Sequence, residues 1–156
     1  MGWPWRSRYG PSADGRRNAA VQCRDSAGRS SSGPQSGGYG STISGRNLKI
    51  WFGDDPHEHY EVQALGRSKL EIGFHAEYPT EARNESVIEV LRARQKTWRR
   101  ALGADAETGR FLGRKDWRRL SEVWEGPGLD TGEAAVEAAE RLARYITTLE
   151  KIRGAT

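Results

Sequence analysis

The sequence predicts an α+β domain in which an antiparallel sheet of three to five strands packs against two amphipathic helices. Two short segments, 59–65 and 70–78, alternate apolar and polar residues on either side of a GRSK loop, which is typical of a β-hairpin. Two longer segments, about 84–102 and 131–153, instead repeat apolar residues at helical spacing. The order strand, hairpin, helix, strand, helix therefore favours a sheet with helices over its apolar face.

Two further segments are candidates for the same sheet. Leu48–Phe52 alternates over a strand length and precedes a turn-forming cluster, Gly53–Pro56. Residues 103–116 are expected to be a polar connection. The segment 117–124 fits either a helix or an alternating strand, and we favour a strand that rejoins the sheet.

The helix boundaries follow from capping residues. Asn84 is a better start than Thr80 for the first helix, and Gly103 is a natural stop. Asp130 and Glu133 form a capping-box-like pair before the second helix. The expected apolar positions are Val87, Ile88, Leu91, Trp98 and Leu102 in the first helix, and Ala135, Ala139, Leu142, Ile146 and Leu149 in the second.

Residues 1–46 differ sharply in composition from the rest of the chain. They hold seven arginines and two acids, whereas residues 47–156 have a net charge of −1. A Gly/Ser/Arg/Pro-rich segment cannot bury enough apolar surface to offset its conformational entropy. We therefore expect a disordered basic tail at 1–46 and a single domain at 47–156. Such a tail is able to make weak nucleic-acid contacts, although most basic tails are simply solvated.

Composition also excludes several classes of protein. The single cysteine, Cys23, excludes an intrachain disulfide framework. No segment approaches the roughly 18 apolar residues of a membrane span, and the N-terminus lacks the apolar core of a secretory signal. The expected location is the cytoplasm, with no membrane partner.

The hairpin has a parity that assigns its side chains to faces. Its alternating apolar residues have even numbers: Tyr60, Val62, Ala64, Leu70, Ile72, Phe74, Ala76 and Tyr78. Because side chains alternate along a strand, the odd-numbered residues must share the opposite face. A turn centred on Arg67 places His59 across from His75 and His57 across from Glu77.

This odd-numbered face is the main candidate site. His57, His59, His75 and Glu77 form a set that can bind a divalent metal such as zinc, manganese or iron. A metal-free alternative is a histidine general base whose pKa is tuned by Glu61 or Glu77. The simplest interpretation, which we favour at this point, is a solvated outer face where His–Glu pairs assist strand pairing.

A second candidate is a basic stripe on the first helix. Arg92, Lys96, Arg99 and Arg100 can contact phosphates, and more basic residues follow at 114–119. Because the domain is close to neutral, a solvated helix face is the favoured interpretation.

Residues 48–152 resemble a family of C-terminal domains of unknown function that are often appended to nuclease-like restriction and defence proteins. The resembling features are His59–Glu61 (HYE), Leu70–Phe74 (LEIGF), the helix containing Leu91 and Trp98, and the closing helix that ends at Leu149–Ile152 (LEKI). The resemblance implies a compact accessory domain with a loose link to nucleic-acid metabolism. It implies no catalytic residues.

Three functions follow as hypotheses. The first is a non-catalytic accessory or regulatory domain that acts through a protein partner or as a homo-oligomer. The second is a metal-dependent enzyme that uses the His/Glu face. The third is a nucleic-acid-binding accessory domain that uses the basic helix and the tail.

Overall fold

The computed structural model describes residues 38–45, 47–111 and 113–154, which form one antiparallel six-stranded sheet and three helices. The strands are β1 (Tyr39–Ser44), β2 (Asn47–Phe52), β3 (Glu58–Ala64), β4 (Lys69–Ala76), β5 (Glu107–Phe111) and β6 (Arg114–Glu125). Their order across the sheet is β1-β2-β3-β4-β6-β5, so every neighbouring pair except β4–β6 is joined by a hairpin connection.

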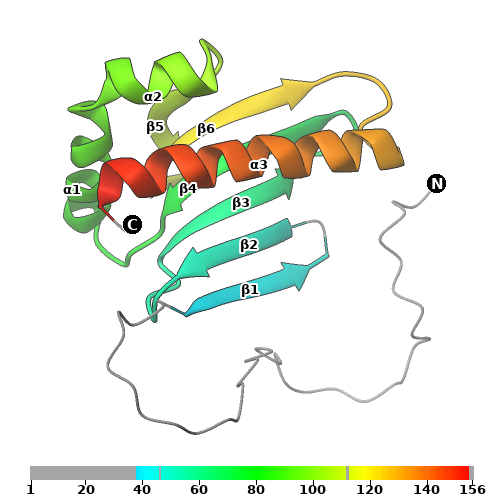
Figure 1. Ribbon diagram of the computed structural model, residues 1–156. Helices are drawn as coiled ribbons and strands as arrows, with labels where there is room; N and C mark the ends of the chain where they lie inside the picture. Colours follow the sequence, from blue (N-terminus) through cyan, green and yellow to red (C-terminus); the bar gives the residue numbers. More distant parts are fainter. Residues whose placement is uncertain (1–37, 46, 112, 155–156) are drawn as a thin grey trace, which may run out of the picture.

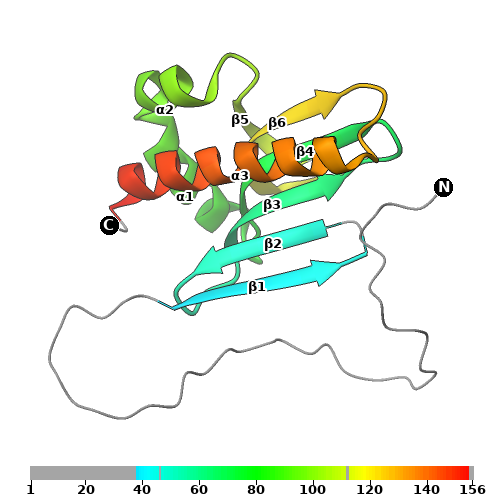
Figure 2. The same cartoon turned by 45° about the vertical axis from the view of Figure 1, so that its right-hand side comes forward.

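The helices are α1 (Glu81–Arg92), α2 (Gln95–Leu102) and α3 (Gly132–Arg153). All of them lie on one side of the sheet, with α3 running across β3 and β4, while β1 and β2 extend beyond it (Figures 1 and 2). The molecule therefore has two layers, and one of its sheet edges has no helix over it.

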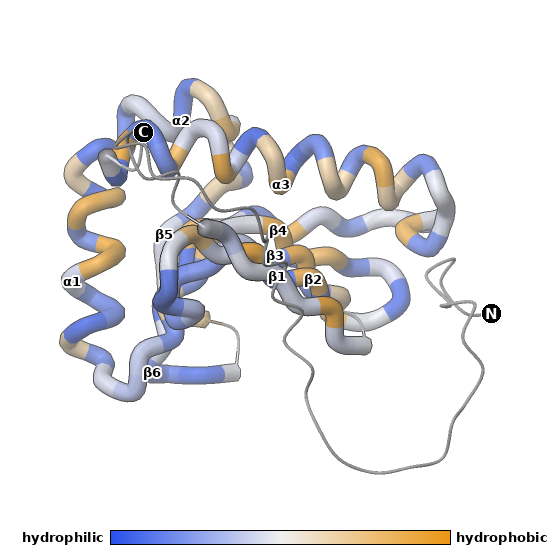
Figure 3. Tube along the Cα trace, turned by 60° about the horizontal axis from the view of Figure 1, so that its bottom comes forward, coloured by the Kyte–Doolittle hydropathy of each residue, from blue (hydrophilic) through white to orange (hydrophobic). Residues whose placement is uncertain are grey.

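The even-numbered face of the β3–β4 hairpin forms the core beneath α3. Tyr60, Ile72 and Phe74 are almost fully buried there, and Leu142 and Leu149 of α3 pack against the same cluster. Figure 3 shows the apolar stretches of the strands and of α3 turned toward each other. The parity prediction is thus confirmed for the even-numbered residues from Tyr60 to Ala76, whereas Tyr78 lies beyond β4 and stacks on His57.

The sheet is larger than the three to five strands expected from the sequence. Residues Tyr39–Ser44, which we assigned to the tail, form the edge strand β1, and Glu107–Phe111, which we expected to be a connection, form the opposite edge strand β5. Both have few apolar residues because edge strands have only one neighbour and expose much of their surface. Residues 1–37 of the expected tail lie outside the described residues.

The first predicted helix is divided in two. The helix α1 ends at Arg92, and α2 begins at Gln95. The bend allows the buried Trp98 indole to donate a 2.7 Å hydrogen bond back to the carbonyl of Leu91. In a continuous helix, the side chains of Leu91 and Trp98 would both lie along one straight face instead.

The start of α1 also differs from the prediction, because Thr80 occupies the N-cap position. Asn84 lies one turn inside the helix and is fully buried. Its side-chain oxygen accepts from the Tyr78 amide at 2.7 Å, and its amide nitrogen donates to the carbonyls of Tyr78 and Asp116 at 2.9 Å each. Asn84 thus joins α1 to β4 and β6 rather than capping the helix.

The remaining elements agree more closely. The segment 117–124 lies within β6, which confirms the strand interpretation, and α3 spans almost the predicted range. Thr131, rather than Asp130, caps α3 by accepting a 3.2 Å hydrogen bond from the Ala134 amide. Within the described part of the chain, no helix has the length and apolar content needed to cross a bilayer.

Candidate metal centre

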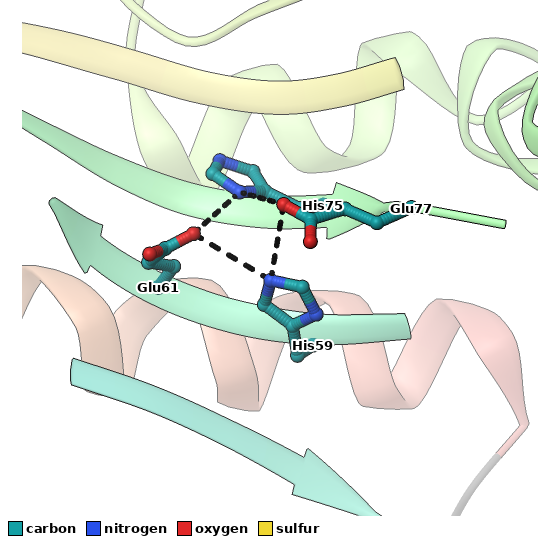
Figure 4. A group of neighbouring side chains, drawn as sticks. All are labelled: His59, Glu61, His75 and Glu77. Atoms are coloured by element: carbon teal, nitrogen blue, oxygen red, sulfur yellow. Dashed lines mark ion pairs between the residues drawn. The ribbon is translucent and has the colours of Figure 1, made fainter. Parts of the chain in front are cut away.

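Four side chains converge on the face of the sheet opposite α3. His59 and Glu61 come from β3, His75 comes from β4, and Glu77 follows the end of β4 (Figure 4). The predicted pairing of His59 with His75 is confirmed by the strand register. Because directly opposed side chains on one face start roughly 5 Å apart, this pairing alone brings the two imidazoles together.

The donor atoms are spaced as they would be around one ion. The Nε2 atom of His59 lies 3.5 Å from Glu61 Oε2 and 3.6 Å from Glu77 Oε1. The Nδ1 atom of His75 lies 2.9 Å from Glu61 Oε2 and 3.7 Å from Glu77 Oε1. Ligand atoms about 2.0–2.1 Å from a tetrahedral zinc ion lie roughly 3.3 Å from one another, so these four atoms need little movement to bind it.

The cluster is buried, although none of the helices in the described part of the chain covers this face. The side chains of His59, Glu61 and His75 are 1%, 1% and 0% exposed, and that of Glu77 is 11% exposed. The expectation of a solvated outer face is therefore wrong. The aromatic ring of Phe111 packs edge-to-face against His75, with ring centroids 4.8 Å apart, and makes a second edge-to-face contact with Trp117. Strands β5 and β6 therefore help to exclude water.

Gly73 makes the close packing of this face possible. It lies between Glu71 and His75 on β4, and a Cβ atom at this position would be 2.4 Å from the Cβ of Ser121 on β6. The space left by the missing side chain is occupied by Ser121, whose hydroxyl donates a 2.6 Å hydrogen bond to Glu71.

Within the described residues, the donor atoms contact one another, but none makes a hydrogen bond of good geometry. His59 Nε2, both oxygens of Glu61, both ring nitrogens of His75 and Glu77 Oε1 are all buried and unsatisfied. Leaving one buried polar atom unsatisfied costs about 1–3 kcal/mol, and charged atoms cost more. A concentration of such atoms at one point is the pattern that a bound cation would satisfy.

Each imidazole also has an oxygen atom next to the ring nitrogen that faces away from the cluster, as metal-binding histidines do. His59 Nδ1 lies 2.9 Å from the carbonyl of Pro56, which leaves Nε2 turned toward the cluster. His75 Nε2 makes only a looser ion-pair contact, 3.5 Å from Glu71 Oε1, and its Nδ1 is turned toward the cluster. In each ring, therefore, one nitrogen faces a supporting oxygen and the other faces the shared centre.

Lys49 of β2 lies at the most exposed side of the cluster. Its ammonium group is 2.9 Å from Glu77 Oε2 and 3.6 Å from Glu61 Oε2, and its side chain is 27% exposed. Arg119 of β6 lies 3.6 Å from Glu71 at the other end. The carboxylates of Glu61, Glu71 and Glu77 thus face the positive charges of Lys49 and Arg119. One negative charge is left, which a metal ion or a protonated imidazole can balance.

Electrostatics favour charged forms throughout the cluster. Burial opposes protonation of His75, but the carboxylates of Glu61, Glu71 and Glu77 outweigh it and raise its pKa to about 10. For His59, burial is again opposed and exceeded by Glu61 and Glu77, which raise its pKa.

The carboxylates show the reverse effect. Burial favours protonation of Glu61, yet hydrogen bonding to the two histidines lowers its pKa to about 2. The same opposition of burial and histidine contacts lowers the pKa values of Glu77 and Glu71. Glu61 and Glu77 are therefore anionic at neutral pH, which is the form that binds metal.

One of the four predicted metal ligands does not belong to the cluster. His57 lies in the turn before β3, is 46% exposed, and bonds to Asp55 at 2.7 Å while stacking on Tyr78. Pro56 and the turn around it carry the chain out of the strand alternation here. Glu61 takes the fourth position, and the parity of the hairpin already placed it on this face, although we assigned it only the tuning of a histidine pKa.

The predicted phosphate-contacting residues are divided between two helices. Arg92 lies on α1 and is paired with Glu85 and Glu89, whereas Lys96, Arg99 and Arg100 lie on α2 beyond the bend. Downstream, Arg118 is buried and paired with Glu81 and Glu85. Arg118 thus joins β6 to α1, and both Arg92 and Arg118 are neutralised by acids of α1.

No protein-family model, curated protein or solved structure matches this chain, and the resemblance inferred from the sequence stays a prediction.

Proposed function

We propose that this domain binds a single divalent transition-metal ion through His59 Nε2, Glu61 Oε2, His75 Nδ1 and Glu77 Oε1. The observation that carries the proposal is the convergence of these four buried donor atoms within 4.8 Å of one another, three of them on residues that are at most 1% exposed. Zinc fits best, because it accepts four nitrogen and oxygen ligands tetrahedrally and has no electronic preference for another geometry.

The ion has a structural role in this proposal. Four protein ligands complete a tetrahedral shell, and a site with so little exposure leaves no open position for a substrate. The ion joins β3 to β4 on the face that has no helix. The protein is then a non-catalytic accessory domain whose fold depends on metal, and not the metal-dependent enzyme that was the second hypothesis from the sequence.

The first test is metal analysis of the purified full-length chain, combined with thermal unfolding. We expect about one zinc per chain after equilibration with zinc and removal of the excess. At a free zinc concentration 100 times the dissociation constant, the ion adds about 2.7 kcal/mol to the free energy of unfolding. For a domain of this size that corresponds to an increase in Tm of roughly 10 °C.

The variant His59→Gln/His75→Gln removes both nitrogen ligands, and His57→Gln is its matched control on the same segment. The double variant should bind no zinc and should melt at the same temperature with and without chelator. The control should bind zinc as the wild type does. Wild-type protein that contains no stoichiometric metal, with a Tm unaffected by zinc or chelator, would disprove the proposal.

A further inference from the structure

The edge strand β1 has surface properties that differ from those of the other edge strand of the sheet. Its sequence, YGSTIS, contains no charged residue and no proline, whereas β5 carries Glu107 and Arg110. Proteins usually protect exposed strand edges with charges or proline, because a bare edge pairs readily with another strand. Among the described residues no strand pairs with the outer edge of β1, so this edge is available for pairing.

The side chains of β1 add an apolar surface beside this edge. Tyr39 and Ile43 are 72% and 75% exposed. They lie opposite Phe52 and Leu48 of β2, so they share the helix-side face of the sheet. Because α3 covers β3 and β4 but not β1, this face is uncovered there (Figures 1 and 2).

An apolar groove continues from this surface toward α3. It has a volume of about 160 Å³ and is lined by Ile43, Leu48 and Val62 of the strands and by Ala135 and Ala139 of α3. The small side chains of α3 leave room between the helix and the first two strands. Ile43 forms part of the groove wall, so a side chain opposite Ile43 on a paired strand would reach the groove.

The backbone pattern defines how a second strand would pair. The amide of Gly53 donates to the carbonyl of Gly38 at 2.8 Å, so Gly38 turns its backbone groups toward β2. In an antiparallel ladder this orientation alternates, so Gly40, Thr42 and Ser44 also face β2. Tyr39, Ser41 and Ile43 then present their backbone groups to the open edge.

We propose that two copies of this chain form a dimer by antiparallel pairing of β1 with β1 about a two-fold axis at Ser41. In this register, Ser41 of one copy lies opposite Ser41 of the other, and Tyr39 of one copy lies opposite Ile43 of the other. All three outward-facing residues are used, and the two aromatic–aliphatic pairs are symmetric, as a two-fold interface requires. The tyrosine ring of each copy then covers the groove beside Ile43 of the other.

The second copy is a better occupant than an unrelated strand because the edge is complementary to itself. A single shift of register would pair a backbone group that faces β2 with one that faces outward, and a two-residue shift would lose both Tyr–Ile pairs. The ion proposed above lies on the opposite face of the sheet, so dimer formation does not depend on it.

Sedimentation equilibrium of the full-length chain over a range of concentrations, with chelator and with zinc, tests the proposal. We expect a monomer–dimer equilibrium in both conditions. Ser41→Pro removes the central outward amide, which the monomer does not use, and proline is tolerated at an edge strand when its nitrogen faces outward. This variant should raise the dimer dissociation constant at least 100-fold and leave the circular dichroism spectrum unchanged.

Ile43→Asp provides a second variant that tests the side-chain pairing, and Val90→Asp is its matched control. Val90 is also exposed, at 54%, but lies on α1 away from β1. Ile43→Asp should give a monomer, and Val90→Asp should dimerise as the wild type does. A wild-type chain that is monomeric at every concentration, or a dimer that persists in both β1 variants, would overturn the proposal.

Discussion

The two faces of the β3–β4 hairpin are buried to the same extent by different chemistry. On the even-numbered face, Tyr60 and Phe74 pack under α3, and Tyr60 donates a 2.6 Å hydrogen bond to Glu150. On the odd-numbered face, His59, Glu61 and His75 are equally buried, and five of their side-chain nitrogen and oxygen atoms have no hydrogen-bond partner among the described residues.

The difference shows what each kind of burial requires. An apolar face is stabilised by any well-fitting apolar layer, since the hydrophobic effect is not directional. A charged face must have a partner for each group, because an unpaired buried charge costs several kcal/mol. Changes on the apolar face should therefore be insensitive to metal and pH, whereas changes on the polar face should depend on both.

The largest expected effect is on the apolar face. Phe74→Ala creates a cavity beneath α3 and should lower the free energy of unfolding by about 3–5 kcal/mol. Chemical denaturation should give the same loss in zinc and in chelator, because Phe74 lies on the other side of the sheet from the donor atoms. A loss that differs between the two conditions by more than about 1 kcal/mol would contradict the separation of the faces.

On the polar face, Glu61→Gln removes one ligand while keeping the shape of the side chain. We expect it to abolish the zinc-dependent stabilisation of about 2.7 kcal/mol at 100 times the wild-type dissociation constant. Glu71→Gln, which alters the carboxylate behind His75 and not a proposed ligand, should weaken zinc binding by about 10–100-fold. Isothermal titration would measure the zinc affinity of both variants. Equal losses of affinity would contradict the assignment of Glu61 as a ligand and of Glu71 as a residue that supports His75.

Lys49→Met should act in opposite directions with and without metal. Its ammonium group pairs with Glu77 and Glu61, so removing it should destabilise the metal-free protein. The same charge repels a bound cation, and its loss should tighten zinc binding by about tenfold, or about 1.4 kcal/mol. If Lys49→Met weakens zinc binding, the ammonium supports the site rather than competing with the ion.

The pH dependence follows from the raised pKa values of His59 and His75. A histidine whose pKa is higher in the folded state adds stability that is fully present below its unfolded pKa of about 6.5 and is lost as the pH rises through its folded value, about 10 for His75. In chelator, Tm should therefore fall between pH 7 and pH 10. In zinc the fall should be smaller, because the ion displaces the protons and competes better as pH rises.

The control for this experiment is His59→Gln/His75→Gln, which lacks both titrating rings. Its Tm should change less over this pH range than that of the metal-free wild type. The same slope in both proteins would assign the effect to other groups.

The smallest expected effect is at His57, which the sequence grouped with the other histidines. Its side chain is 46% exposed and lies outside the cluster. His57→Gln should change the free energy of unfolding by no more than about 0.5 kcal/mol, as surface substitutions usually do, and leave zinc affinity unchanged. A large loss of zinc affinity would show that His57 contributes to the metal site.

Local pattern was sufficient where a single strand or helix decided the outcome. The alternation in 59–65 and 70–78 correctly separated the two faces and paired His59 with His75, because side-chain direction repeats every two residues whatever the strand packs against. The helical spacing of the last segment likewise predicted α3. These are properties of a short stretch of backbone, so they can be determined from the sequence by itself.

Contacts between distant segments decided the rest. The edge strands β1 and β5 depend on pairing with neighbours, the bend between α1 and α2 depends on the buried Trp98, and the burial of the polar face depends on Phe111 of β5 and on the gap left by Gly73. The sequence by itself determined which residues share a face. Only the tertiary structure decided that the polar face is buried, because burial depends on what the rest of the chain brings against it.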